Sequence, residues 1–379
     1  MRKAIIWIHR WLGLLSGLVV LVVCMTGALL VFEKEIRTLT EPYRRVSPKS
    51  LPVLPPSRIA AHVTTHTGFM VSSMDYGGTE KSVVCTLRTG ERPSRSTLVY
   101  VDPYSGAVLH IKDLRRDFFK WALAGHYYFW LPSKPGKLLV SWATLTFSVL
   151  LLSGLVVWFP RKRTQLKQGF QVKWRAKRKR LLYDLHNVLG FYSCAVLLIL
   201  AATGLVYGFS WFADGLYRAT SGGQPLPKTE RPLSDKEQPS PIANVIDSVF
   251  YRHIEPKLYD SGRVQTLHLA EKGTEAVWLY DNPDASTRYR RETRYFDRYT
   301  GEELQGDGAG FYASVYAEAA FADRLKRMNY DIHVGSIGGL TTKTLAFLAC
   351  CVGGLLVVTG YWMWWGRQRK LNQKKQQTR

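Results

Sequence analysis

Four long stretches of this chain contain no Asp, Glu, Lys or Arg: residues 11–32, 138–159, 188–212 and 344–365. A helix rises about 1.5 Å per residue, so each stretch is long enough to cross a hydrocarbon layer of about 30 Å. Trp or Tyr stands at several of the ends, which is typical of anchors at a membrane interface. Basic residues precede the first stretch, as in a signal peptide, but the stretch is long and no A-x-A site is evident. We therefore predict a membrane protein with four spanning helices.

The distribution of charge predicts the orientation of these helices. The net charge is +23, and most of the excess lies in the first ten residues, in residues 161–184 and in the tail after Trp365. The positive-inside rule places these segments, and both termini, in the cytoplasm. Residues 33–137 and 213–335, which hold 28 of the 29 acids, then lie outside. The basic loop is typical of inner-membrane proteins and favours anionic lipid, so we expect no nucleic acid as a partner.

The cysteines exclude several kinds of site. Four of the five lie in apolar stretches (Cys24, Cys194, Cys350 and Cys351), and Cys85 is alone outside. The chain has no C-x-x-C, which argues against a zinc ribbon, a thioredoxin motif or a covalently attached c-type haem.

The two halves of the chain carry the same pattern. The sequence H-R-W-L-G begins at His9 and H-N-V-L-G begins at His186, and a Gly follows each His after 18 residues. Each half then has an external segment with a D-x-x-[ST]-G phrase, at residues 102–106 and 297–301, which predicts a strand, a turn and a further strand. Further strands are predicted near 82–87 and 276–280, and helices at 55–66 and 241–254. The pattern indicates a duplication with parallel repeats and an axis along the membrane normal.

Four histidines occupy matching places in this pattern. His9 and His186 fall at the cytoplasmic face, and His126 and His333 fall at the outer face, before the second and fourth spans. In a four-helix bundle with twofold symmetry, each pair can point inward from opposite sides.

Glycines accompany these histidines at helical spacing. Gly13 and Gly190 lie at i+4 from His9 and His186, on the same helix face. Gly27 and Gly204 lie at i+18, five turns on, at about 27 Å along the axis, which is the depth of the outer pair. In the same way Gly154 and Gly360 are expected near the inner pair. Glycine is also common in membrane helices for packing alone.

Two facing imidazoles at each level predict axial ligation of a six-coordinate b-type haem, with two haems per chain. The main alternative for each pair is a zinc or copper site, although no carboxylate or thiolate stands at the right depth. Each histidine alone could also be an ordinary interfacial polar group. His62 and His66, at i,i+4, could hold a metal but are expected to be surface groups. Arg10, Lys137 and Lys343 are candidates either for pairing with haem propionates or for anchoring at the surface.

The chain resembles the PepSY-associated transmembrane proteins, also called iron-regulated membrane proteins. The resemblance rests on I-H-R-W-L-G-L at 8–14, L-H-N-V-L-G at 185–190, G-H-Y-Y-F-W-L-P at 125–132 and the two D-x-x-[ST]-G turns. It covers nearly the whole chain. Within this family the chain is similar to the inner-membrane ferrisiderophore reductases of the ferrioxamine-reductase type.

The resemblance implies a fold and an activity. The fold would be a membrane all-α four-helix bundle with two periplasmic α+β PepSY-like domains. The activity would be transfer of electrons through two haem b groups, on His9 with His186 and on His126 with His333, to an Fe(III)-siderophore in the periplasm. Fe(II) would then be released. In the second half D-I-H-V-G at 331–335 replaces the aromatic phrase of the first half, so substrate contacts are expected to be asymmetric.

The domain organisation follows from these predictions. The helical segments are 1–32, 138–160, 185–212 and 336–366, and the periplasmic domains are 33–137 and 213–335. A basic cytoplasmic loop (161–184) and a basic cytoplasmic tail (367–379) complete the chain.

Three matters stay open on sequence. The chain has no G-x-G-x-x-G after a strand, so the electron donor would be a membrane quinol or a separate cytoplasmic reductase. The aromatic residues near His126 (Trp121, Tyr127, Tyr128 and Trp130) could line a docking surface or anchor the helix. Alternative functions are a non-enzymatic membrane-anchored PepSY binding protein and a siderophore or iron transporter. For the transporter, Thr26, Ser153, Thr203 and Thr359 are the only modest polar candidates within the spans.

Overall fold

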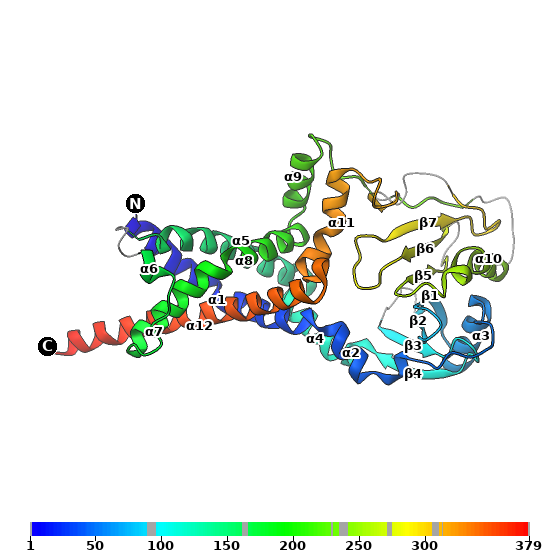
Figure 1. Ribbon diagram of the computed structural model, residues 1–379, viewed down its shortest axis with the longest axis horizontal. Coiled ribbons are helices and arrows are strands. Elements are labelled where there is room, and N and C mark those ends of the chain that lie inside the picture. The colour runs from blue at the N-terminus through cyan, green and yellow to red at the C-terminus, as the bar shows by residue number, and fades with distance from the viewer. Residues whose placement is uncertain are drawn as a thin grey trace. The chain divides into compact units, whose positions relative to one another are not determined.

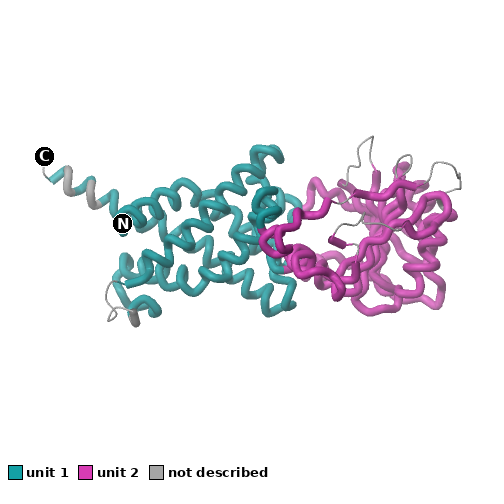
Figure 2. The backbone as a smooth tube through the Cα atoms, turned by 90° about the horizontal axis from the view of Figure 1, so that it is seen from above, with its two compact units in different colours: residues 1–33, 118–215, 332–379 teal, residues 34–117, 216–331 magenta. Residues whose placement is uncertain are grey.

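The computed structural model describes residues 2–88, 96–160, 166–228, 230–234, 242–270, 275–304, 311–312 and 314–377. The chain divides into two compact units, coloured separately in Figure 2. The helical unit comprises residues 1–33, 118–215 and 332–379, and the sheet unit comprises residues 34–117 and 216–331. Each unit is therefore assembled from segments that are far apart in the sequence.

The helical unit contains the four predicted spans, which form helices α1 (Arg2–Val31), α5 (Ser133–Trp158), α8 (Gly190–Gly208) and α12 (Gly339–Gln377) (Figure 1). All four are long and apolar enough to cross a membrane, so the protein is a multi-pass membrane protein. Helix α1 packs against α5 and α12, and α8 packs against the same two helices. Helices α1 and α8, which begin the two halves, thus lie diagonally opposite in the bundle.

The spans differ slightly from the predicted ranges. A continuous helical run extends from Arg178 to Gly208, because α7 (Arg178–Asp184) and a π-helical turn (Leu185–Leu189) lead directly into α8. Helix α8 ends four residues before the predicted limit of 212, where Phe209 is extended (φ −125°, ψ 125°). Apolar composition alone cannot locate that end, since residues 209–212 are as apolar as the helix. Residues 161–165, at the start of the predicted basic loop, lie outside the described residues.

Two shorter helices carry the second pair of histidines. Helix α4 (Phe118–Tyr128) ends just after His126, and α11 (Phe321–His333) ends at His333. A tight corner joins α4 to α5: Phe129 and Trp130 both have positive φ (52° and 55°). A Cβ at Gly136 would lie 2.3 Å from the carbonyl oxygen of Tyr128, so only glycine fits there. Other short helices in the described part of the chain are α2 (Glu33–Thr40), α6 (Leu166–Gly169) and α9 (Ser210–Thr220), with 3₁₀ turns at Pro42–Arg44, Leu114–Arg116, Glu255–Lys257 and Ser336–Gly338.

The sheet unit is built on seven antiparallel strands in the order β4-β3-β2-β1-β5-β6-β7. The first half supplies β1 (Met70–Tyr76), β2 (Val83–Arg88), β3 (Thr97–Val101) and β4 (Val108–Asp113). The second half supplies β5 (Val264–His268), β6 (Val277–Asn282) and β7 (Glu292–Phe296). Strands β1 and β5 pair directly, for example at Met74 with Leu267.

Both halves also share one hydrophobic core. Helix α3 (Pro56–Thr67) and helix α10 (Ile242–Val249), which continues into a π-helical turn (Phe250–Ile254), contact each other. The core combines side chains from both halves, among them Ile59, Met74, Phe250 and Leu279, all of which are fully buried. Burial of so much apolar surface stabilises the two halves together.

The expectation of two separate periplasmic domains therefore differs from the structure, in which their strands form a single sheet. The pairing of β1 with β5 joins residues about 190 positions apart, and no local pattern in the sequence specifies it. The unit boundaries differ as well. Residues 118–137, 213–215 and 332–335, expected in the external segments, belong to the helical unit.

The two D-x-x-[ST]-G phrases form matching turns. The Asp102 carboxylate accepts hydrogen bonds from the backbone N–H groups of Tyr104 and Ser105 (2.8 and 3.1 Å), and the Asp297 carboxylate does so from Tyr299 and Thr300 (2.7 and 2.9 Å). A glycine with φ near +74° closes each turn, at Gly106 and Gly301. The first turn connects β3 to β4, as the sequence predicts. The second follows β7, and in the described residues it leads to an isolated bridge between Glu303 and Phe296 instead of a further strand.

Candidate functional site: two facing pairs of histidines

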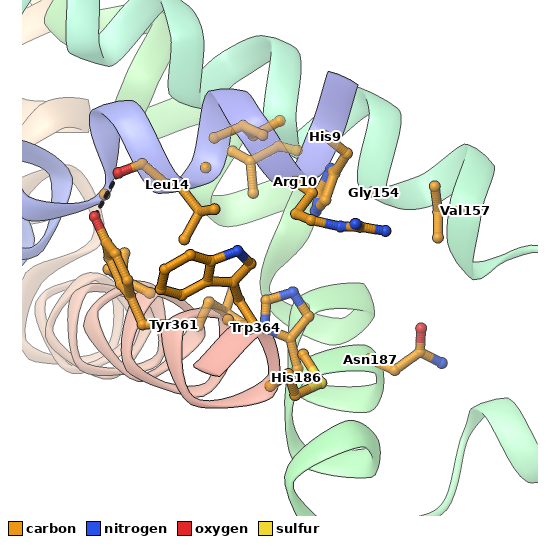
Figure 3. A pocket seen from close by; sticks show the side chains of 18 of the residues that line it. His9, Arg10, Leu14, Gly154, Val157, His186, Asn187, Tyr361 and Trp364 are labelled. Atoms are coloured by element: carbon orange, nitrogen blue, oxygen red, sulfur yellow. Dashed lines mark hydrogen bonds between the residues drawn. The ribbon is translucent and has the colours of Figure 1, made fainter. Parts of the chain in front are cut away.

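The first pair consists of His9 on α1 and His186 in the π-helical turn before α8. Their ring centres are 6.4 Å apart and the ring planes cross at 89°. Both side chains line one cavity, and Figure 3 shows them with Arg10 and Trp364 nearby. Because α1 and α8 are diagonal partners in the bundle, the two rings approach from opposite sides.

The second pair consists of His126 at the end of α4 and His333 at the end of α11. Their ring centres are 6.0 Å apart and the planes cross at 57°. His333 also contacts the ring of Tyr207, and His126 that of Tyr127. The structure thus brings together the same two pairs that the repeat predicts.

Each of the four imidazoles is hydrogen-bonded to a Ser or Thr hydroxyl. The Nδ1 atoms of His9 and His186 lie 2.9 and 3.0 Å from the hydroxyls of Ser153 and Thr359. In the second pair, Nδ1 of His126 lies 3.3 Å from the Thr26 hydroxyl and 3.0 Å from the Val23 carbonyl. Nδ1 of His333 lies 3.0 Å from the Thr203 hydroxyl and 3.1 Å from the Leu200 carbonyl.

These bonds fix which nitrogen carries the proton. Each hydroxyl donates its own hydrogen to a backbone carbonyl of its helix, at Leu150, Leu355, Val22 and Ile199 respectively. The hydroxyl oxygen must therefore accept from the imidazole, which places the proton on Nδ1. The Nε2 lone pair of all four histidines is then free for a ligand.

Glycine follows the hydroxyl residue in every case. A Cβ at Gly154, Gly360, Gly27 or Gly204 would lie 3.2–3.6 Å from the Cε1 atom of His9, His186, His126 or His333, respectively. The repeated [ST]-G dipeptide therefore supplies an acceptor for the ring and leaves space beside it. These four hydroxyls are the polar groups that the sequence offered for a transporter, and each is hydrogen-bonded to an imidazole.

A comparison with protein-family models gives one match, to the PepSY-associated TM region, over residues 6–367. The chain belongs to this family. A search of curated proteins with the sequence of this chain finds no match. For this PepSY-associated TM protein, the match covers both histidine pairs, all four spans and the sheet unit.

The separation of the rings leaves room for one metal ion between each pair. Two metal–nitrogen bonds of about 2 Å, with about 1.1 Å from each nitrogen to its ring centre, separate the centres by roughly 6 Å. Within the described ranges, no group of three or more His, Cys, Asp or Glu side chains is arranged to hold a metal ion. Two opposed imidazoles with no further protein ligand suit an axial pair, and they do not complete the tetrahedral shell that zinc prefers.

The cavity of the first pair has the lining expected for a flat, largely apolar group. Gly13 and Gly190 line it, and a Cβ added at either would lie no closer than 3.9 and 3.5 Å, respectively, to a leucine side chain. Two cationic residues, Arg10 and Arg367, also line it. Arg10 was a predicted partner for propionates; Arg367 was not singled out in the sequence, where it stands among many basic residues of the tail.

The other candidates of the PepSY-associated TM protein have different surroundings. Lys343 lies 6.0 Å from the ring of Phe32. His62 packs beside Gly106, and His66 is exposed, in agreement with their prediction as surface groups. Trp121 and Trp130 stack at 4.8 Å, and the Trp130 indole N–H donates to the Trp121 carbonyl, so this pair braces the corner after α4.

Sequence reasoning missed the role of the hydroxyls. Ser153, Thr359, Thr26 and Thr203 were noted only as polar groups within apolar helices. The signal that could have found them is the dipeptide itself, which recurs once in each span immediately before a glycine already assigned to a histidine.

Proposed function

We propose that this protein is a di-haem b electron-transfer protein of the bacterial inner membrane that reduces an Fe(III)-siderophore on its periplasmic side. The observation that carries the proposal is the pair of facing imidazoles at each of two levels, with every Nδ1 bonded and every Nε2 available. The family supports a membrane protein; the haems, the substrate and the reductase activity are the proposal.

In this proposal the four histidines act as axial ligands. His9 and His186 would hold one haem and His126 and His333 the other, and each haem would supply one-electron redox chemistry. Gly13 and Gly190 admit the flat macrocycle to the first site. Arg10 and Arg367 line the same cavity and would pair with the carboxylates of that group, and most of the cavity lining is apolar.

The spacing of the two pairs fits transfer across the membrane. Gly27 abuts His126, and it follows His9 by 18 residues on the same helix. That number of residues spans about 27 Å, close to the thickness of the hydrocarbon layer. Two centres divide this distance into shorter steps.

The proposed reaction at the outer face needs no acid–base machinery. Siderophores bind Fe(III) through hard oxygen donors, and the larger Fe(II) ion is held less tightly. One electron therefore suffices to weaken the complex and release the iron. The electron enters from a membrane quinol or from a separate cytoplasmic reductase.

The deciding experiment is the dithionite-reduced minus oxidised visible spectrum of the purified full chain in detergent, with haem counted per chain. We expect b-type bands and about two haems per chain. The variants His9→Ala and His126→Ala should each lose one of the two. His66→Ala, at an exposed histidine outside both pairs, is the matched control and should keep both.

Activity is tested separately by following Fe(II) release from a ferric hydroxamate added to the reduced protein. A colourless protein from haem-replete cells would refute the electron-transfer proposal and favour a non-enzymatic PepSY binding protein. Two stoichiometric zinc or copper ions in place of haem would favour the metal-site alternative.

A further inference from the structure

We infer that the four hydroxyl residues are positioning residues, which set the reduction potential and the ring orientation of each centre through its histidine. The inference rests on the proposed function and deepens it. It concerns Ser153, Thr359, Thr26 and Thr203, none of which would touch the iron. Each instead bonds to Nδ1 of its histidine and leaves Nε2 as the ligand atom.

The four hydroxyls differ from other hydroxyls in the apolar helices by their bond to an imidazole. A Ser or Thr hydroxyl in a helix can satisfy itself by donating to a carbonyl of the preceding turn, as Thr344 and Ser193 do in the same unit. The four positioning hydroxyls make that bond and also accept from an imidazole. Thr359 is only 1% exposed, so its hydroxyl bonds to protein groups rather than to bulk water.

The hydroxyls change the ligand strength of the histidines. An acceptor on Nδ1–H raises the basicity of the imidazole and fixes the orientation of its ring. A more basic imidazole stabilises Fe(III) relative to Fe(II), so each hydroxyl lowers the potential of its centre. Reduction of a stable ferric complex requires an electron of low potential, and the hydroxyls help to provide it.

The two histidines of the first pair differ in the hydroxyl residue that each one contacts. The three threonines each donate to two carbonyls of the preceding turn, whereas Ser153 has one such bond, to Leu150 at 3.1 Å. Threonine is also stiffer about χ1 than serine. The ring of His186 is therefore held more firmly than that of His9, and Thr359 should be the stronger determinant of the first site.

The test is Thr359→Val, which keeps the shape of the side chain and removes the hydroxyl. The measurements are the two midpoint potentials by spectroelectrochemistry and the low-spin ferric signals by electron paramagnetic resonance. We expect the potential of one centre to rise and its g anisotropy to change, because that anisotropy depends on the angle between the imidazole planes. The other centre should stay as in the wild type.

Two further variants make the result specific. Thr344→Val is the matched control on the same helix, since the Thr344 hydroxyl bonds only to its own helix; it should change neither centre. Thr359→Ser restores the hydroxyl and should return both readouts toward those of the wild type. Ser153→Ala should give a smaller shift at the same centre.

The inference is overturned if Thr359→Val retains two haems with both potentials and both signals unchanged. Loss of haem that Thr359→Ser does not restore also overturns it, since the side chain would then act through packing alone. These outcomes are distinct from failure of the proposed function, which a colourless wild-type protein would reveal before any variant is made.

Discussion

The two halves of the sheet unit bury an arginine in different ways. In the first half, Arg37 is 8% exposed and donates to the carboxylates of Asp117 and Glu41. In the second half, Arg327 is fully buried and donates to three main-chain carbonyls, those of Tyr289, Ser314 and Arg291 (3.0, 2.9 and 2.6 Å). The Arg37 guanidinium is therefore hydrogen-bonded to ionised carboxylates, and the Arg327 guanidinium is hydrogen-bonded to uncharged main-chain carbonyls.

The network of the first half is larger than one ion pair. Lys112 on β4 contacts both carboxylates, at 2.7 Å from Asp117 and by a short bond to Glu41. The network therefore joins α2, β4 and the residue that precedes α4. The first arginine therefore depends on the ionisation of carboxylates, whereas the second donates to main-chain carbonyls, which do not titrate.

The largest expected effects come from removing either arginine. Arg37→Met leaves two buried carboxylates with too few partners and should cost about 3–5 kcal/mol of unfolding free energy. Arg327→Met leaves three buried carbonyls without their donor, at about 1–3 kcal/mol each. Hydrogen exchange of the strand amides in the full chain, followed by mass spectrometry, measures both losses.

The matched control is Arg115→Met. Arg115 pairs with Asp113 at 2.8 Å, but its side chain is 77% exposed, so its loss should not change the exchange of the strands. Equal exchange in the Arg37 variant and in this control would contradict a structural role for the buried network.

Lowering the pH should destabilise the first half of the sheet unit through its buried carboxylates. Burial raises the pKa of Glu41, but hydrogen bonds from Lys112, Arg44 and Arg37 outweigh it and lower the pKa to about 2 from 4.5. A carboxyl with a lowered pKa stabilises the fold fully above its unfolded value, and that stability is lost as the pH falls. We expect the amides of β3 and β4 to lose protection between pH 4.5 and 2. Glu41→Gln should flatten that dependence, and an unchanged slope would refute this assignment.

The smallest expected losses of unfolding free energy come from substitutions at the two matching turns. Alanine at Gly106 or Gly301 must adopt positive φ, which costs about 1–2 kcal/mol. At Gly106 the new Cβ would also lie 2.5 Å from the His62 ring, whereas at Gly301 the nearest side-chain atom, of Val245, is 3.6 Å away.

Gly106→Ala should therefore destabilise the sheet unit more than Gly301→Ala, as measured by chemical denaturation of the full chain. His62→Ala, which removes the ring, should abolish the excess when it is combined with Gly106→Ala. Equal costs at the two glycines, with or without His62, would show that the turns are equivalent in energy as well as in form.

Much of the helical unit was predictable because a membrane leaves few choices. A run of apolar residues without charge must satisfy its backbone internally, so each of the four runs forms a helix. The repeat then paired His9 with His186 and His126 with His333, and the structure has these contacts. Helix ends were less predictable, as at Phe209, because hydropathy does not change there.

The sequence alone determined the spans, the repeat, the two turns and the choice of the four histidines, since each depends on composition or on regular spacing along one element. The tertiary structure alone decided what joins elements distant in sequence. It paired β1 with β5, so that two expected domains became one sheet. It also placed Ser153 against His9 and Thr359 against His186, 144 and 173 residues away. Such contacts depend on how helices and strands pack in three dimensions, and that packing leaves no period in the sequence.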